Sequence, residues 1–300
     1  MVQVARRKRQ TKSHSQPGAA PPPVYHVLVL ATMSAGKSSL INALIGRELL
    51  PAGNEATTAC LTRIERNQRS KYFHGKYFSR AGSELGSQRQ TSLEHVRAWN
   101  RDADIKHIHL AGKFSNASRL PSKLVLHDTP GPNNSQDQRH AELMLEAVRT
   151  VPFQSLCYVL NGSQPATHDD RRLLEQLREL LPQRAGLRII FILNKIDLLD
   201  PERGEDLATC VSNARTYLER LGFADPVVVP TMADLALSAR KALNASALTR
   251  VERNKLRIWL ENISLGEHGA RDLEQLLNHS GIKTVESLLY QHSIAIQAHA

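Results

Sequence analysis

The feature that most constrains this chain is a short loop between an apolar strand and a helix. The run Val24–Leu30 is rich in β-branched residues, as in a buried central strand, and helical spacing extends from Ser38 to Gly46. The loop Ala31–Ser39 reads ATMSAGKSS. A GK[ST] sequence in this context is typical of a loop that wraps phosphate with backbone N–H groups at the positive end of a helix.

Each position of this loop has an expected role. Gly36 lets the backbone approach a phosphate without a Cβ, Lys37 reaches the β- and γ-phosphates, and Ser38 offers a hydroxyl to Mg²⁺. Ala31 stands where the motif has its first glycine, and we expect its Cβ to strain the turn and weaken affinity. The residues expected to bind the nucleotide phosphates are Ala35, Gly36, Lys37, Ser38 and Ser39.

Short apolar runs alternate with helical patterns along the chain, which predicts an α/β fold with a mostly parallel sheet covered on both faces. Strands are predicted at 123–127, 156–160, 187–193 and 227–229, and helices at 171–181 and 205–221. The polar segment 71–119 breaks this rhythm, and we expect one strand near 105–110, antiparallel at an edge of the sheet. A long helix over 234–260 and two shorter ones at 270–278 and 283–296 should follow.

A second motif predicts which base the site would accept. Asn194-Lys195-Ile196-Asp197 follows the apolar run 190–193. Asp197 can accept hydrogen bonds from the N1 and N2 donors of guanine, a pair that adenine lacks, so the wrong base would leave a buried carboxylate unpaired. The stem of Lys195 can cover the base, and Asn194 can tie this loop to the phosphate loop. The pattern favours GTP over ATP.

Two further segments have the pattern of γ-phosphate switches. Asp128-Thr-Pro-Gly131 follows a strand, so that Asp128 would hold Mg²⁺ through a water and the N–H of Gly131 would contact the γ-phosphate. The segment 49–59 contains Gly, Pro and the pair Thr57 and Thr58. One threonine hydroxyl would bind Mg²⁺ and its carbonyl would help to place the attacking water. The residues alone leave Thr57 and Thr58 both open, and the family resemblance described next favours Thr58, which aligns to it without gaps.

These motifs together resemble the G domain of a bacterial dynamin-like protein. The matching stretches are 32–46 (TMSAGKSSLINALIG), 50–51, 54–58 (NEATT), 128–135 (DTPGPNNS), 194–197 (NKID) and 279–282 (HSGI), within a match that spans roughly 25–297. The resemblance implies a P-loop NTPase fold of the dynamin G-domain type with C-terminal helices. The base-capping loop near 229–233 is only weakly similar.

The resemblance also implies a mechanism. Pro132 stands where small Ras-like GTPases carry a water-orienting glutamine, and dynamin-like proteins replace that group with the phosphate loop, the switch threonine and a second head across the nucleotide. Ser34 would contact the γ-phosphate and a charge-compensating monovalent cation. Many relatives have Gln where this chain has Met33, so we expect basal hydrolysis below about 10⁻² s⁻¹.

The ends of the chain depart from that family. Residues 1–23 are basic and Pro-rich and are predicted to be a disordered tail, followed by the G domain over 24–297 with no complete helical stalk. The chain would then be either a degenerate head or half of a split system in which a partner protein supplies the stalk. No apolar stretch approaches the roughly 18 residues of a membrane span, and no signal peptide is evident, so we expect a cytoplasmic protein.

Three functions are compatible with these features. The first is a GTPase stimulated by head-to-head dimerisation, which the intact Lys37, Ser38, Thr58 and Asp128 favour. The second is a nucleotide-dependent binding switch with little turnover, which Ala31 and Met33 favour. In the third, the five basic residues of the tail anchor the head on acidic lipid or nucleic acid, placing the protein peripherally at a membrane or the nucleoid.

Overall fold

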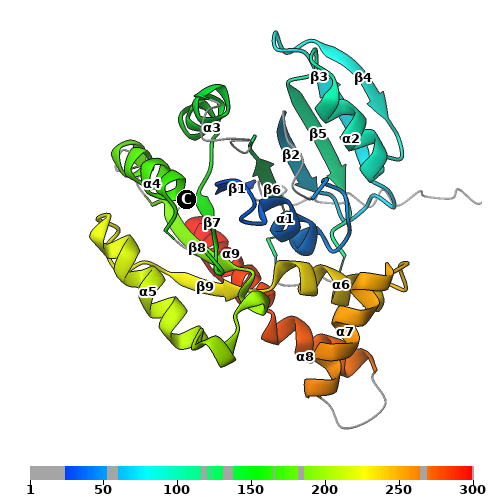
Figure 1. The fold of residues 1–300 in the computed structure, drawn as a ribbon. Helices are drawn as coiled ribbons and strands as arrows, with labels where there is room; N and C mark the ends of the chain where they lie inside the picture. The colour runs from blue at the N-terminus through cyan, green and yellow to red at the C-terminus, as the bar shows by residue number, and fades with distance from the viewer. Residues whose placement is uncertain are drawn as a thin grey trace, which may run out of the picture.

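The computed structural model describes residues 24–52, 60–115, 120–121, 123–130, 138–164, 166–181, 186–263 and 269–298. They form a nine-stranded sheet with helices on both faces (Figure 1). The tail predicted over 1–23 lies outside the described residues, and so do Thr57, Thr58 and Gly131.

The middle of the sheet is the predicted parallel core. Five strands lie side by side, and each neighbouring pair is parallel: β6 (Leu124–Asp128), β1 (Tyr25–Ala31), β7 (Ser155–Asn161), β8 (Arg188–Asn194) and β9 (Val228–Thr231). In β1, Val27 and Val29 belong to one buried cluster, whereas Leu28 and Leu30 belong to the cluster on the opposite face. Burial on both faces explains the continuous apolar runs, and the predicted α/β class is confirmed.

Beyond β6 the sheet continues as a wing whose pairings are mostly antiparallel. β2 (Leu61–Arg66) is antiparallel to β6, and after it come β5 (His107–Gly112), β3 (His74–Phe78) and β4 (Glu84–Gln88). The strand predicted near 105–110 is β5, and it does run against the parallel core. Its expected place at the edge is wrong, because β3 and β4 lie outside it. Those two strands are short and partly exposed, so no apolar run marked them.

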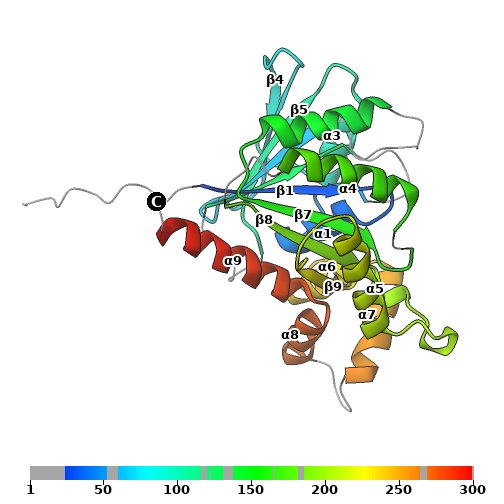
Figure 2. The ribbon, with the colours of Figure 1, turned by 90° about the vertical axis from the view of Figure 1, so that its left-hand side faces the viewer.

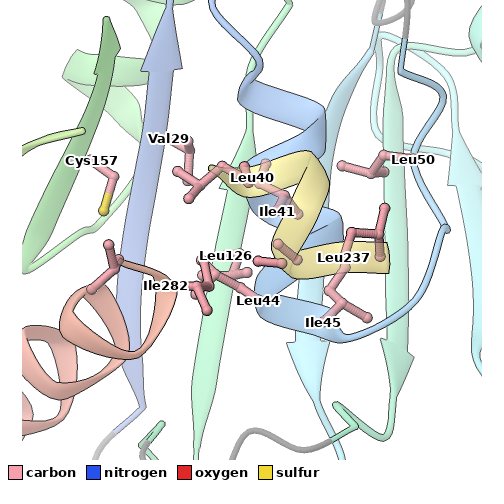
Figure 3. Close-up of a cluster of buried hydrophobic side chains, with 14 of the residues drawn as sticks. Val29, Leu40, Ile41, Leu44, Ile45, Leu50, Leu126, Cys157, Leu237 and Ile282 are labelled. Atoms are coloured by element: carbon pink, nitrogen blue, oxygen red, sulfur yellow. The ribbon is translucent and has the colours of Figure 1, made fainter. Parts of the chain in front are cut away.

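Helices cover the two faces in two groups. One group consists of α1 (Lys37–Ile45), α2 (Leu93–Arg101), α6 (Ala233–Leu243), α7 (Arg250–Ile263), α8 (Ala270–His279) and α9 (Ile282–Ala298), and the other of α3 (Gln138–Thr150), α4 (His168–Leu180) and α5 (Leu207–Arg220). Figure 2 shows α3 and α4 on one side of β1 and β7, with α9 on the other. Figure 3 shows Leu40 and Leu44 of α1 beside Val29 and Leu126 of the sheet. The helix that follows the phosphate loop is therefore packed directly on the central strands.

The C-terminal part differs from the prediction at one point. The single helix expected over 234–260 is wrong: α6 ends at Leu243, and α7 (Arg250–Ile263) starts anew. Ala245 has a φ of 50°, outside the helical region, and Thr249 and Glu252 form reciprocal hydrogen bonds that cap α7, Thr249 N–H to Glu252 Oε2 at 2.6 Å and Glu252 N–H to Thr249 Oγ1 at 3.2 Å. The two shorter helices are confirmed as α8 and α9. No helix in the described ranges is long and apolar enough to cross a membrane.

Candidate nucleotide-binding site

The predicted motifs lie at the carboxyl ends of three strands of the parallel core. The phosphate loop follows β1, the Asp128 motif follows β6, and the Asn194 motif follows β8. These strands are parallel, so their carboxyl ends share one edge of the sheet. In open α/β sheets that edge is where ligands bind. The geometry thus brings together residues that are widely separated in sequence.

The phosphate loop turns sharply through two residues in left-handed conformation. Ser34 has a φ of 60° and Gly36 a φ of 96°, and Gly36 is the residue immediately before α1. Ala31, by contrast, still pairs with Val159 as the last residue of β1 and is not among the described residues with positive φ. The backbone strain expected at Ala31 is therefore wrong, since an extended residue accepts a Cβ without penalty. Ser34 is exposed and Ser39 is half-buried.

Lys37 and Asp128 form a buried ion pair. The Lys37 ammonium donates to Oδ1 of Asp128, and their side chains are 8% and 1% exposed. Ser38, the next residue of α1, is also 8% exposed. A buried charge is stable only when it is paired or coordinated, so each member of this pair neutralises the other. The lysine that we expect to bind phosphate and the carboxylate that we expect to hold the metal, predicted from separate motifs, thus contact each other.

Asn194 connects three loops at the same edge. Its Nδ2 donates to the carbonyl of Ala35 at 2.9 Å, and its Oδ1 accepts from Thr231 Oγ1 at 3.2 Å and from the N–H of Ala233 at 3.0 Å. The predicted contact between this residue and the phosphate loop is therefore present. A Cβ on Gly36 would overlap Asn194 Nδ2, so glycine is needed there for close approach as well as for its φ.

Asp197 lies in a short 3₁₀ turn, η2 (Ile196–Leu198), that follows Lys195, whose φ is 66°. The Asp197 side chain is 8% exposed, and its Oδ2 is 3.6 Å from Nζ of Lys255 on α7. The neighbouring loop after β9 is held by the C-terminal HSGI segment: the N–H of Met232 donates to the Ser280 carbonyl at 2.9 Å. The weakly similar segment 229–233 is thus held from two sides, by Asn194 of the NKID motif and by Ser280.

Asp170 is a residue of this site that sequence reasoning missed. It lies in the first turn of α4 and is 1% exposed. Its Oδ1 accepts from Thr32 Oγ1 at 2.8 Å and Tyr158 Oη at 2.9 Å, and its Oδ2 accepts from Thr167 Oγ1 at 2.8 Å. Burial raises the pKa of the Tyr158 hydroxyl, and the Asp170 charge raises it further. Thr32 belongs to the phosphate loop, so this buried carboxylate anchors the loop to α4. The Thr167-x-x-Asp170 capping pattern was visible in sequence, but its contact with Thr32 was not.

Comparisons with known proteins agree with this arrangement. The model of the Dynamin family matches residues 27–196. A bacterial dynamin-like protein of Nostoc punctiforme is 27% identical over 204 residues, which cover 64% of this chain and 28% of that protein. Dynamin-like protein A of Bacillus subtilis is 26% identical over 167 residues, 56% of this chain and 13% of the relative. This chain therefore spans less than a third of either protein.

The fold comparison points the same way. One similar solved structure is that of an oligomerised bacterial dynamin pair that provides a mechanism for the long range sensing and tethering of membranes. It superposes with a TM-score of 0.55 at 18% identity and covers 91% of this chain and 42% of that one. At 18% identity the similarity is evidence of a shared fold alone.

Proposed function

This chain belongs to the dynamin family, and from that membership and the geometry of the site we propose that it binds a guanine nucleotide with Mg²⁺ and hydrolyses GTP. One observation carries the proposal: the three motif loops converge. Lys37 pairs with Asp128, and Asn194 donates to the phosphate-loop carbonyl of Ala35. A lysine and a carboxylate at the phosphate end of one sheet edge are two of the groups that P-loop nucleotide hydrolysis uses, and the Asn194 amide joins the predicted base loop to them.

At the phosphate end of the site, nucleotide binding would replace the Lys37–Asp128 ion pair by contacts of Lys37 with phosphate and of Asp128 with the metal. Lys37 would leave Asp128 when phosphate oxygens arrive, and the carboxylate of Asp128 would then help to hold the metal. The hydroxyl of Ser38 and the carboxylate of Asp128 are hard oxygen donors, which suit Mg²⁺. The hydroxyl of Thr58 would complete the protein ligands. When bound, Mg²⁺ would neutralise charge that develops on the phosphates.

The base end would read guanine through one carboxylate. Asp197 accepts the N1–H and N2–H donors, Lys195 covers the base with its stem, and Asn194 holds both loops in register. Because Asp197 is largely buried, a base without those donors would leave it unpaired. Discrimination against adenine should then be large.

The hydrolytic step would rest on Ser34, Lys37 and Thr58. Lys37 stabilises charge on the γ-phosphate, the Thr58 carbonyl orients the attacking water, and the N–H of Gly131 contacts the γ-phosphate. Ser34 is exposed in its left-handed turn, where its hydroxyl can reach the γ-phosphate and a monovalent cation. We propose that a second head, docked across the nucleotide, completes the site and raises a low basal rate.

A nucleotide-dependent binding switch is the second candidate. Met33 is 55% exposed in the phosphate loop and offers no hydrogen bond to a water. Turnover would then be minimal, and the nucleotide state would control docking of a partner that supplies a stalk. We propose that 24–297 is the G domain and that 1–23 is a basic tail. In a third candidate function, acidic lipid or nucleic acid would bind this tail and place the cytoplasmic head peripherally at a membrane or the nucleoid.

Two measurements test the proposal. The first is the affinity of purified protein for GDP and ADP with Mg²⁺, beside the variant Asp197→Asn. We expect a strong preference for GDP that the variant loses, and equal affinities in the wild type would refute the base assignment. The second is phosphate release per molecule against protein concentration. A rate that climbs with concentration supports the dimer-stimulated enzyme, and a flat rate near zero supports the switch.

A further inference from the structure

The base-reading carboxylate has a cationic neighbour that no motif predicted. Lys255 lies on α7, and its Nζ is 3.6 Å from Asp197 Oδ2. The same ammonium donates to Oδ2 of Asp234, in the first turn of α6. One lysine therefore bridges the 3₁₀ turn of the base loop and the start of the helix that follows β9.

The elements around this bridge are fixed independently of it. Asp234 directly follows Ala233, whose backbone N–H donates to Asn194 Oδ1 at 3.0 Å. Helices α6 and α7 also pack against each other (Figure 1). The Lys255 side chain is 26% exposed and that of Asp197 is 8% exposed, so solvent has little access to the carboxylate. A bridge between rigid elements holds its members in a fixed geometry, which is what a recognition group requires.

The lysine is charged at neutral pH. Burial works against the charge, but Asp234 and then Asp197 outweigh it and raise the pKa of Lys255. The ammonium of Lys255, 3.6 Å from Oδ2, restricts the rotation of the Asp197 carboxylate. The carboxylate also has about four lone-pair sites, and a base with two parallel N–H donors occupies one on each oxygen. A site on Oδ2 thus stays available to Lys255 while a base is bound.

We propose that Lys255 is a positioning residue for base recognition, which holds the Asp197 carboxylate so that both of its oxygens face the two donors of guanine. This inference rests on the proposed function. A carboxylate with a fixed orientation accepts a hydrogen bond from each of the two donors of guanine. When the base lacks the second donor, one carboxylate oxygen is left without that hydrogen bond, because the carboxylate cannot rotate to another partner. Lys255 therefore sharpens selectivity at the exocyclic amino group in particular.

The test compares three nucleotides on three variants. GDP, IDP (which lacks the exocyclic amino group) and ADP are titrated with Mg²⁺ against wild type, Lys255→Met and Lys255→Arg. We expect Lys255→Met to weaken GDP about tenfold and IDP much less, so that the GDP-to-IDP ratio falls, while ADP is unchanged. Lys255→Arg keeps the charge and should retain most of the ratio.

Matched controls separate positioning from packing. Arg257→Ala on the same helix removes a charge whose side chain is 65% exposed and pairs with Glu261 at 3.7 Å. It should leave all three affinities within about twofold. Asp234→Asn leaves Lys255 in place but removes its anchor, so it should lower the GDP-to-IDP ratio in the same direction, even if Lys255→Met folds poorly.

Several results overturn the inference. An unchanged GDP-to-IDP ratio in folded Lys255→Met shows that the lysine does not position Asp197. A gain in GDP affinity shows that the lysine competes with the base. Equal GDP and ADP affinity in the wild type refutes the proposed function itself, and this inference with it, so the two failures are distinguishable.

Discussion

Replacing Arg240 by Met should strongly destabilise the fold. Arg240 on α6 is fully buried, and its guanidinium donates to the carbonyls of Ala43 and Leu44 at the end of α1, and to Glu286 on α9. Three helices are therefore joined by one side chain. The helix that carries Lys37 and Ser38 is anchored at its far end by this contact.

The magnitude follows from the burial of both partners. The side chains of Arg240 and Glu286 are 0% and 2% exposed, and removal of one member of such a pair costs about 3–5 kcal/mol because the other is left uncompensated. Burial already raises the pKa of Glu286 above 4.5, although Arg240 opposes the shift. Without Arg240 this pKa should rise further. When the pKa of a carboxyl group is higher in the folded than in the unfolded state, its contribution to stability is present at low pH and is lost as pH rises. Between the two pKa values the free energy of unfolding then falls by up to about 1.4 kcal/mol per pH unit.

Urea unfolding at pH 5 and pH 7 checks both parts of this reasoning. We expect Arg240→Met to lose about 3–5 kcal/mol at pH 7 and less at pH 5. The double variant Arg240→Met with Glu286→Leu removes both charges of this pair and should recover much of the loss. Losses that simply add, with a coupling energy under about 0.5 kcal/mol, would refute the argument.

Three further outcomes are expected. Gly36→Ala should sharply weaken nucleotide binding in an equilibrium titration, because its Cβ overlaps Asn194 Nδ2 and its φ is 96°; near-normal affinity would contradict the close approach. Thr58→Ala should bind GTP normally but stop phosphate release, whereas Thr57→Ala should not, and the reverse result would move the role to Thr57. Burial lowers the pKa of His292, whose Nδ1 lies 2.8 Å from Tyr25 Oη, so the folded state resists protonation and stability should fall as pH drops below about 6.5. Thermal melts should show a smaller drop between pH 7 and pH 5 for His292→Gln, and equal drops would count against that assignment.

The sequence alone determined the parallel core and the motif loops. Continuous apolar strands followed by glycine, lysine and carboxylate at fixed spacing are local signals, and each needs only a few consecutive residues to be read. For the same reason Gly46 was correctly predicted as the end of α1, where its φ is 81° and its N–H bonds the Asn42 carbonyl. Strands β3 and β4 carried no such signal, because partly exposed strands have no continuous apolar run.

Only the tertiary structure decided the contacts between distant segments that no motif predicts. Asp170 and Thr32 are far apart in sequence and share a hydrogen bond because α4 begins beside the phosphate loop. Lys255 contacts Asp197 because the helix is interrupted between α6 and α7. The helical pattern over 234–260 gave no sign of this interruption. Such contacts depend on the relative placement of packed elements, which is set by the two buried clusters and not by any local sequence pattern.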